Sequence, residues 1–131
     1  MSAYSYETHL PLNLADARTR TVAALAAQGF GILTEIDVQA TFKKKLEVEF
    51  RPYIILGACN PGLAHRAISA EASAGLLLPC NVVLQVQGEG TQVAIADPRS
   101  MFSVVGRDDM EPLVAEAEQR LKAVLAALQS A

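Results

Sequence analysis

Apolar residues recur at helical spacing along the last part of the chain. From Met110 to Leu128 they are spaced 3, 1, 3, 4, 3, 1 and 3 residues apart, so they share one face of a helix. The pattern predicts a long helix over 109–129, with Asp108 or Asp109 as its N-cap. Its apolar face must lie against a sheet or against a second copy of the chain.

Alternating and continuous apolar runs predict the strands. Residues 81–87 alternate between apolar and polar, and they are joined to 91–97 across Gly88-Glu89-Gly90. Because glycine allows the positive φ of a tight turn, these two strands form a hairpin with one face open to water. Residues 53–59 are nearly all apolar, as in a central strand that is covered on both faces or flanked by other strands.

Shorter patterns complete the order of elements. The predicted elements are a strand at 3–9, a helix from Leu14 to about Gly29 capped by Asn13, a strand at 30–36, a short helix capped by Asp37, an extended stretch at 47–50 and a helix at 61–72 opened by Asn60-Pro61. Apart from the two short inserted helices the order is β-α-β-β-β-β-α. This order predicts an α+β fold of two layers in a single domain over 1–131. Its sheet is mostly antiparallel with about five strands, and the long C-terminal helix lies on one face.

Composition and charge narrow the class of protein. The chain has 131 residues, of which 51% are hydrophobic and 19% charged, which is typical of a globular domain with a core of its own. A net charge of −3 argues against a nucleic-acid partner, which requires a basic face. The start lacks the pattern of a signal peptide, and the apolar runs are too short for a membrane span. With only two cysteines, the expected location is the cytoplasm.

The chemistry-bearing residues concentrate between 53 and 82, where each cysteine is followed by an asparagine. Cys59 precedes a predicted helix N-terminus, whose N–H groups and dipole favour a thiolate or a bound anion. The short helix with Lys44 could supply a counter-charge if it folds nearby. The candidate ligand-binding residues are therefore Cys59, Asn60, Cys80, Asn81 and Lys44.

Two other interpretations stay open. In the first, Cys59 and Cys80 meet and act as a redox pair, or they bind zinc or copper with His65 as a third soft ligand. No C-x-x-C spacing supports a metal site, and His65 falls on the polar side of its helix. In the second, both cysteines are buried and inert in a structural or partner-interaction dimer. No catalytic template is complete, so the residues leave open whether the chain is an enzyme, and they indicate no cofactor.

Several blocks of residues resemble a known family. They are Ile36-Asp37-Val38, Lys44-Lys45, Phe50-Arg51-Pro52-Tyr53, Ile55 to Pro61, Leu63-Ala64 and Gly75 to Val82. These blocks are similar to the domain-of-unknown-function family 302. The resemblance implies a β-α-β4-α fold similar to one half of the TATA-binding protein, and a homodimer. It carries no catalytic residue over. At Leu46-Glu47-Val48 the chain departs from the pattern, in which a glycine is expected after the lysines.

Together these observations favour a non-catalytic, homodimeric binding module. Its expected ligand is a small polar or anionic molecule held near Cys59-Asn60, and neither nucleic acid nor a membrane is expected as a partner.

Overall fold

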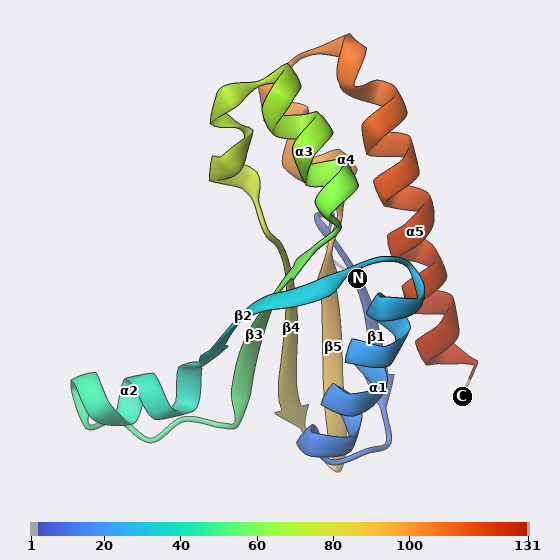
Figure 1. Ribbon diagram of the computed structural model, residues 1–131. Coiled ribbons are helices and arrows are strands. Elements are labelled where there is room, and N and C mark those ends of the chain that lie inside the picture. Colours follow the sequence, from blue (N-terminus) through green and yellow to red (C-terminus); the bar gives the residue numbers. More distant parts are fainter. Residues whose placement is uncertain (1–2, 131) are drawn as a thin grey trace.

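Five antiparallel strands and two long helices form the two layers of the molecule (Figure 1). The computed structural model describes residues 3–130. The strands are β1 (Ser5–Leu10), β2 (Gly31–Asp37), β3 (Tyr53–Cys59), β4 (Cys80–Gln87) and β5 (Gly90–Ala96). The helices are α1 (Leu14–Ala27), α2 (Val38–Leu46), α3 (Pro61–Ala70), α4 (Pro98–Phe102) and α5 (Glu111–Gln129), with the 3-10 turns η1 (Ala72–Leu77), η2 (Ser103–Val105) and η3 (Asp108–Met110). The predicted α+β fold is confirmed.

The strand order β1-β5-β4-β3-β2 places the N-terminal strand at one edge and β2 at the other. All four pairings are antiparallel. The predicted hairpin of β4 and β5 turns through two residues, and Gly88 adopts the positive φ of 63° that the turn requires. As predicted, β3 is flanked on both sides, by β4 and β2.

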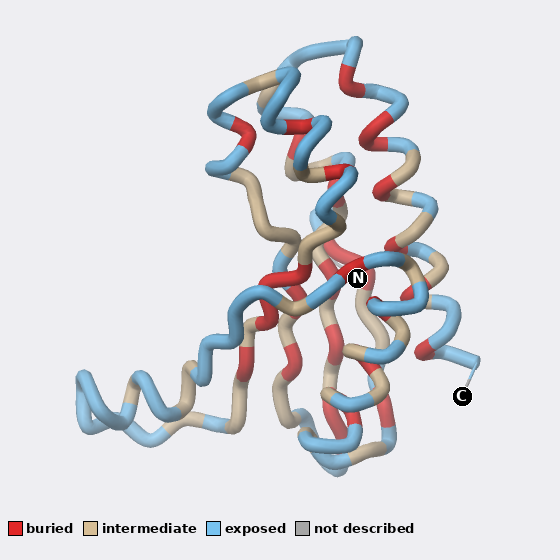
Figure 2. The backbone as a smooth tube through the Cα atoms, viewed as in Figure 1, coloured by how far each residue is buried: buried red, intermediate tan, exposed pale blue. Residues whose placement is uncertain are grey.

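The core lies between the sheet and the two long helices (Figure 2). Leu56, Leu84 and Ile95 of the sheet are fully buried there. Leu25 of α1 and Leu121 of α5 are equally inaccessible to solvent, which confirms the predicted apolar stripe of the long helix. Each such side chain contributes about 1.5–3 kcal/mol by leaving water, so this layer holds α1 and α5 on the sheet.

Side-chain caps begin three of the helices as predicted. Asn13 Oδ1 accepts from Asp16 N at 2.8 Å, Asp37 Oδ1 from Ala40 N at 2.9 Å, and Asn60 Oδ1 from Leu63 N at 3.2 Å. A fourth cap lies in a stretch for which the sequence predicted only the end of the hairpin. There Asp97 Oδ1 accepts from Arg99 N at 2.9 Å and starts α4, since the cap is followed at once by Pro98.

The predicted cap of the long helix is wrong. Helix α5 begins at Glu111, and Met110 stands at the N-cap without a side-chain hydrogen bond. The carboxylate of Asp109 instead accepts from the Arg107 guanidinium at 2.6 and 3.0 Å. A charged, forked donor two residues away competes successfully with a backbone N–H for this acceptor.

Residues 38–50 project from the sheet as an arm, at the lower left of Figures 1 and 2. Helix α2 forms most of this arm and has no buried residue, and the 47–50 stretch that was expected to be extended is a loop. Aromatic contacts hold the arm together, because the Phe42 and Phe50 rings meet edge to face at 5.1 Å and Arg51 lies 4.5 Å over the Phe50 ring.

Glu47 ends α2 in the left-handed conformation, at φ 55°. This position is where the family pattern led us to expect a glycine. A side chain with a Cβ costs about 1 kcal/mol in this conformation. We therefore expect Glu47→Gly to stabilise α2 and to slow exchange of its amide hydrogens about fivefold, as measured by NMR. Glu47→Ala is the control, because it removes the same carboxylate but keeps the Cβ. Equal protection in both variants would mean that backbone strain is not relieved by the glycine.

Candidate functional site

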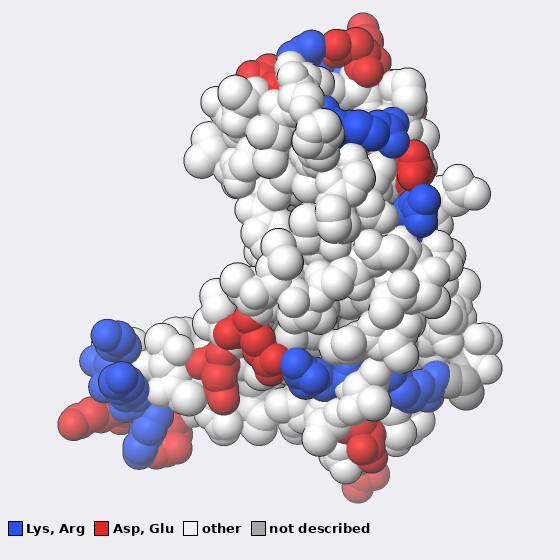
Figure 3. Space-filling model, in the orientation of Figure 1, with Lys and Arg blue, Asp and Glu red and all other residues white. Residues whose placement is uncertain are grey.

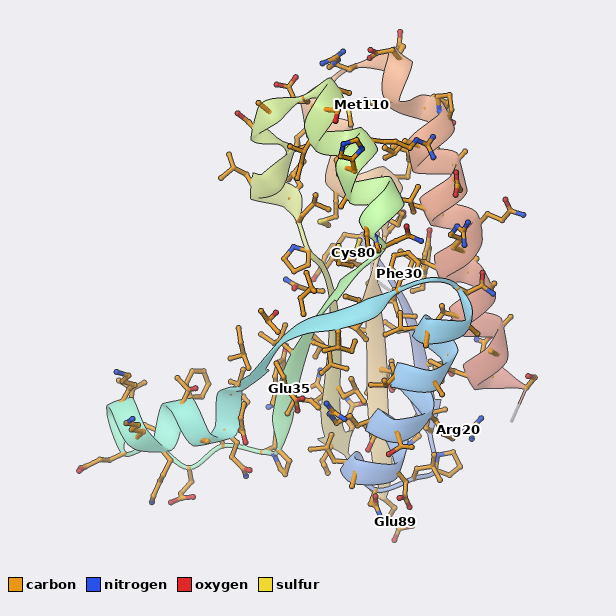
Figure 4. All side chains as sticks on the ribbon, in the orientation of Figure 1. Arg20, Phe30, Glu35, Cys80, Glu89 and Met110 are labelled. Atoms are coloured by element: carbon orange, nitrogen blue, oxygen red, sulfur yellow. The ribbon has the colours of Figure 1, made fainter. Side chains whose placement is uncertain are left out.

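The two cysteines lie at the same end of the sheet. Cys59 ends β3 and Cys80 begins β4, and Cys80 pairs with Ala58, the neighbour of Cys59. Both thiols are free and half-buried, and both line one small cavity of about 30 Å³. Figure 4 shows Cys80 beside Phe30, another residue of the cavity wall. The sequence left open whether the cysteines meet, and the structure brings them to one cavity.

This cavity is unsuited to the polar ligand that the sequence suggested. Its volume is enough for about one water molecule. Its wall is formed mostly by apolar side chains, among them Phe30, Leu63, Phe102 and Leu113. Burial raises the pKa of the Cys80 thiol to about 11, and the nearby Cys59 contributes to the increase. Cys80 is therefore a neutral thiol near pH 7, with little nucleophilic character.

Both polar atoms of the Asn60 side-chain amide form hydrogen bonds. Its Oδ1 caps α3, and its Nδ2 donates to the carbonyl of Gln28 at 3.5 Å. Arg120 Nη1 of α5 donates to the same carbonyl at 3.0 Å. Next to it, Gly29 has a φ of 84°, and a Cβ there would lie only 2.9 Å from Asn60 Nδ2. The Asn60 side chain thus ties the start of α3 to the end of α1.

Lys44 and His65 are not part of this arrangement. Lys44 is exposed on α2, beyond the opposite end of β3 from Cys59 (Figure 1). His65 is exposed on α3. Among residues 3–130 no three His, Cys, Asp or Glu side chains come close enough to hold a metal ion. The set of Cys59, His65 and Cys80 is therefore not assembled as a metal site.

A larger depression crosses the face of the sheet that α1 and α5 do not cover. We call it the sheet groove, and its volume is about 340 Å³. Its apolar floor and walls come from Tyr4, Tyr53, Val83, Ala94, Ala96 and Met101, and its polar groups from Ser5, Glu7, Asn81 and Gln85. Ile95 also borders the groove, but its side chain is buried on the side of the sheet that faces the helices. Four strands contribute to it, so it depends on the register of the whole sheet.

Three polar side chains of the sheet groove have defined hydrogen-bond partners. Ser5 Oγ donates to Glu7 Oε2 at 2.8 Å, and Gln92 Nε2 donates to Glu7 Oε1 at 3.4 Å. Gln85, which pairs with Gln92 across the hairpin, accepts through Oε1 from Arg51 Nε at 2.8 Å. Asn81, one of the predicted ligand residues, is exposed.

A second depression of about 180 Å³ continues from the sheet groove toward η1. The two depressions share Asn81, Ala96 and Met101, and the second also includes Cys80. Two predicted ligand residues, Cys80 and Asn81, therefore border one continuous depression. The sequence signal for it was the alternation in β4, which indicated an open face. The residues contributed by β1 and β5 could not be found without the pairing of strands.

No helix among residues 3–130 has the length and apolar character needed to cross a membrane.

Comparisons with known proteins agree on the family and on the fold. The family model of DUF302, a domain of unknown function, matches residues 6–128. A crystal structure of an uncharacterized conserved DUF302 protein from Bacillus stearothermophilus superimposes with a TM-score of 0.88. It shares 24% identity with this chain and covers 97% of it and 99% of its own length. At that identity the likeness shows the fold alone. None of the curated proteins matches the chain.

The burial of Cys80 predicts a loss of stability at alkaline pH. Folding raises the pKa of this thiol from 9.0 to about 11. Its contribution is thus fully present below pH 9, where the unfolded chain also holds the proton, and it is lost as the pH rises through 11. The largest loss in the free energy of unfolding is about 2.7 kcal/mol, which corresponds to a difference of two between the folded and unfolded pKa. Between pH 8 and 11 we expect the free energy of unfolding in urea to fall less for Cys80→Ala than for the wild type. Burial also raises the pKa of Tyr6, which is present in both proteins, so part of the decrease in the free energy of unfolding remains in both. Parallel curves for the two proteins would contradict the prediction.

Proposed function

The chain belongs to the DUF302 family of domains of unknown function, and we propose that it is a non-catalytic, homodimeric module that binds a small molecule in the sheet groove. The observation that supports this proposal most is the mixed lining of the groove. An apolar floor beside a few polar groups is the usual composition of a small-molecule site.

The lining favours a small molecule that is partly apolar. Val83, Ala94 and Ala96 offer an apolar floor without charge, suited to an apolar part of a ligand. Asn81 is exposed at the point where the two depressions join, and its amide has both donor and acceptor groups for a polar end of the ligand. Glu7 adds a carboxylate to one wall, which disfavours an anion.

The proposed ligand lies beside Asn81 and not at Cys59-Asn60, where the sequence suggested it. The cavity beside Cys59 has about 30 Å³, whereas the sheet groove has about 340 Å³. Asn60 already bonds to Leu63 N and to the carbonyl of Gln28. An anion at the start of α3 would have to displace these contacts.

Thiol chemistry has less support as a function. The two thiols share a cavity, which suits a redox pair, but Cys80 is held in its neutral form by burial. The interpretation of two inert cysteines in a structural dimer agrees better with that environment.

A dye that becomes fluorescent on apolar surfaces tests the sheet groove. We expect Nile red, an uncharged dye, to bind the native protein, because a groove of this size lies open on the sheet. Val83→Glu places a carboxylate at the centre of the floor and should abolish most of the fluorescence at the same protein concentration.

Gln87→Glu is the matched control, since it adds the same charge to the same strand outside the groove. It should leave the fluorescence unchanged, and thermal melting should confirm that both variants are folded. If Val83→Glu binds the dye as well as Gln87→Glu does, the groove is not the binding surface.

A further inference from the structure

Helix α2 is amphipathic, and its Phe42 ring meets the Phe50 ring, but none of its residues is buried. Phe42 is only half-buried, Leu46 is 64% exposed, and the adjoining Val48 is also exposed. A helix of nine residues is marginal in water by itself, because most helical stability comes from packing of the apolar face. We therefore expect a partner to cover the apolar side chains of the arm and to stabilise its helix.

Strand β2 is exposed on the same side of the molecule. It forms an edge of the sheet, and Leu33 and Ile36 are 67% and 49% exposed. An edge strand is usually protected by a charge, a bulge or a covering element, since its free N–H and C=O groups invite another strand. Strand β2 has Glu35, Asp37 and a register shift between Ile32 and Thr34, but its apolar side chains stay exposed. Strand β2 leads directly into the arm, so one partner can cover both (Figure 1).

An apolar surface on the lobe that contains η1 lies across a hollow from the arm. Figure 3 shows the outline of the molecule indented between the arm and the lobe that contains η1, with few charged residues along the indentation. Leu76 of η1 is 88% exposed, the highest value among the large apolar side chains described. It borders a depression of about 340 Å³, the η1 pocket, which is formed by Glu71, Ser73, Ala74, Leu76, Leu77, Val104 and Val105.

We propose that a second copy of this chain fills the hollow, with each arm seated against the η1 pocket of the other copy. This inference rests on the homodimer in the proposed function and specifies its interface. One chain supplies both the arm and the pocket on either side of one hollow, so a twofold axis through the hollow repeats the same contact twice. Strand β2 of one copy then faces β2 of the other.

The charges of the arm and of the η1 pocket favour a second copy of the chain as the partner. Lys44 and Lys45 of the arm form no ion pair with any of residues 3–130, whereas Lys43 pairs with Glu49. Glu71 lies in the η1 pocket, and its only ion pair within the described chain is with Arg107, at 3.4 Å. The arm therefore brings free cations to a pocket with a carboxylate. An anionic lipid surface is a poorer match for the arm, because Glu47 and Glu49 flank its lysines.

Association of the full-length protein tests the interface. By light scattering we expect the wild type to have a mass of twice 14.0 kDa. Leu46→Asp on the arm and Leu76→Asp on η1 should each weaken association by about tenfold or more, because each places a charge in the apolar contact. Ala126→Asp, exposed on the far end of α5, is the control and should remain dimeric. All these positions are exposed, so circular dichroism should show unchanged folding.

Cross-linking tests which surfaces meet. In a background with Cys59→Ala and Cys80→Ala, Leu46→Cys and Leu76→Cys are made as separate proteins, mixed and oxidised with oxygen. Each thiol loses one hydrogen to the oxidant as the S–S bond forms. We expect a disulfide between the two different variants, and far less product from either variant alone.

The outcomes of these experiments distinguish a failure of the arm contact from a failure of the homodimer. A wild-type dimer that survives both aspartates and gives no mixed disulfide would overturn the arm contact and leave a dimer through another face. A monomeric wild type would overturn both. Sedimentation of the protein with phosphatidylserine vesicles, lost in Leu46→Asp, would assign the arm to a membrane surface instead.

Discussion

The packing of α1 and α5 onto a single face of the sheet is the constraint on which the rest of the structure depends. Leu56, Leu84 and Ile95 are fully buried under these helices, and the residues that alternate with them point to the other side. Neither α1 nor α5 covers that other side, and α4 only borders the sheet groove through Met101, so the groove stays open. The same arrangement leaves β2 at an edge with the arm beyond it.

This constraint also separates the two places where a function was sought. The cysteine end of the sheet is closed by α3, α4 and α5, which leave a cavity of about 30 Å³ and raise the pKa of Cys80. The groove and the arm, by contrast, present apolar side chains to solvent. Recognition in this protein is therefore expected on the uncovered surfaces, and the thiols are expected to be part of the packing.

Most of the fold could be predicted from the sequence because its signals are local. Asn13, Asp37 and Asn60 cap helices within three residues, and the stripe of α5 is a repeat along one element. The errors also have local causes. Arg107 takes the Asp109 carboxylate that was expected to cap α5, and Asp97 starts a helix too short to show a repeat. The site was harder to predict, because the groove gathers residues from four strands and Lys44 lies beyond the opposite end of β3 from Cys59.

The central claim is that a second copy covers the arm, and a single tryptophan tests it most directly. The sequence contains no Trp, so Leu46→Trp gives a fluorescence signal from the arm alone. Tryptophan keeps an apolar side chain at this position and should preserve the contact. We predict that its emission moves to shorter wavelength as the protein concentration is raised, in step with the dimer fraction seen by light scattering. Emission typical of a solvent-exposed indole at every concentration, in a sample that is dimeric, would contradict the account.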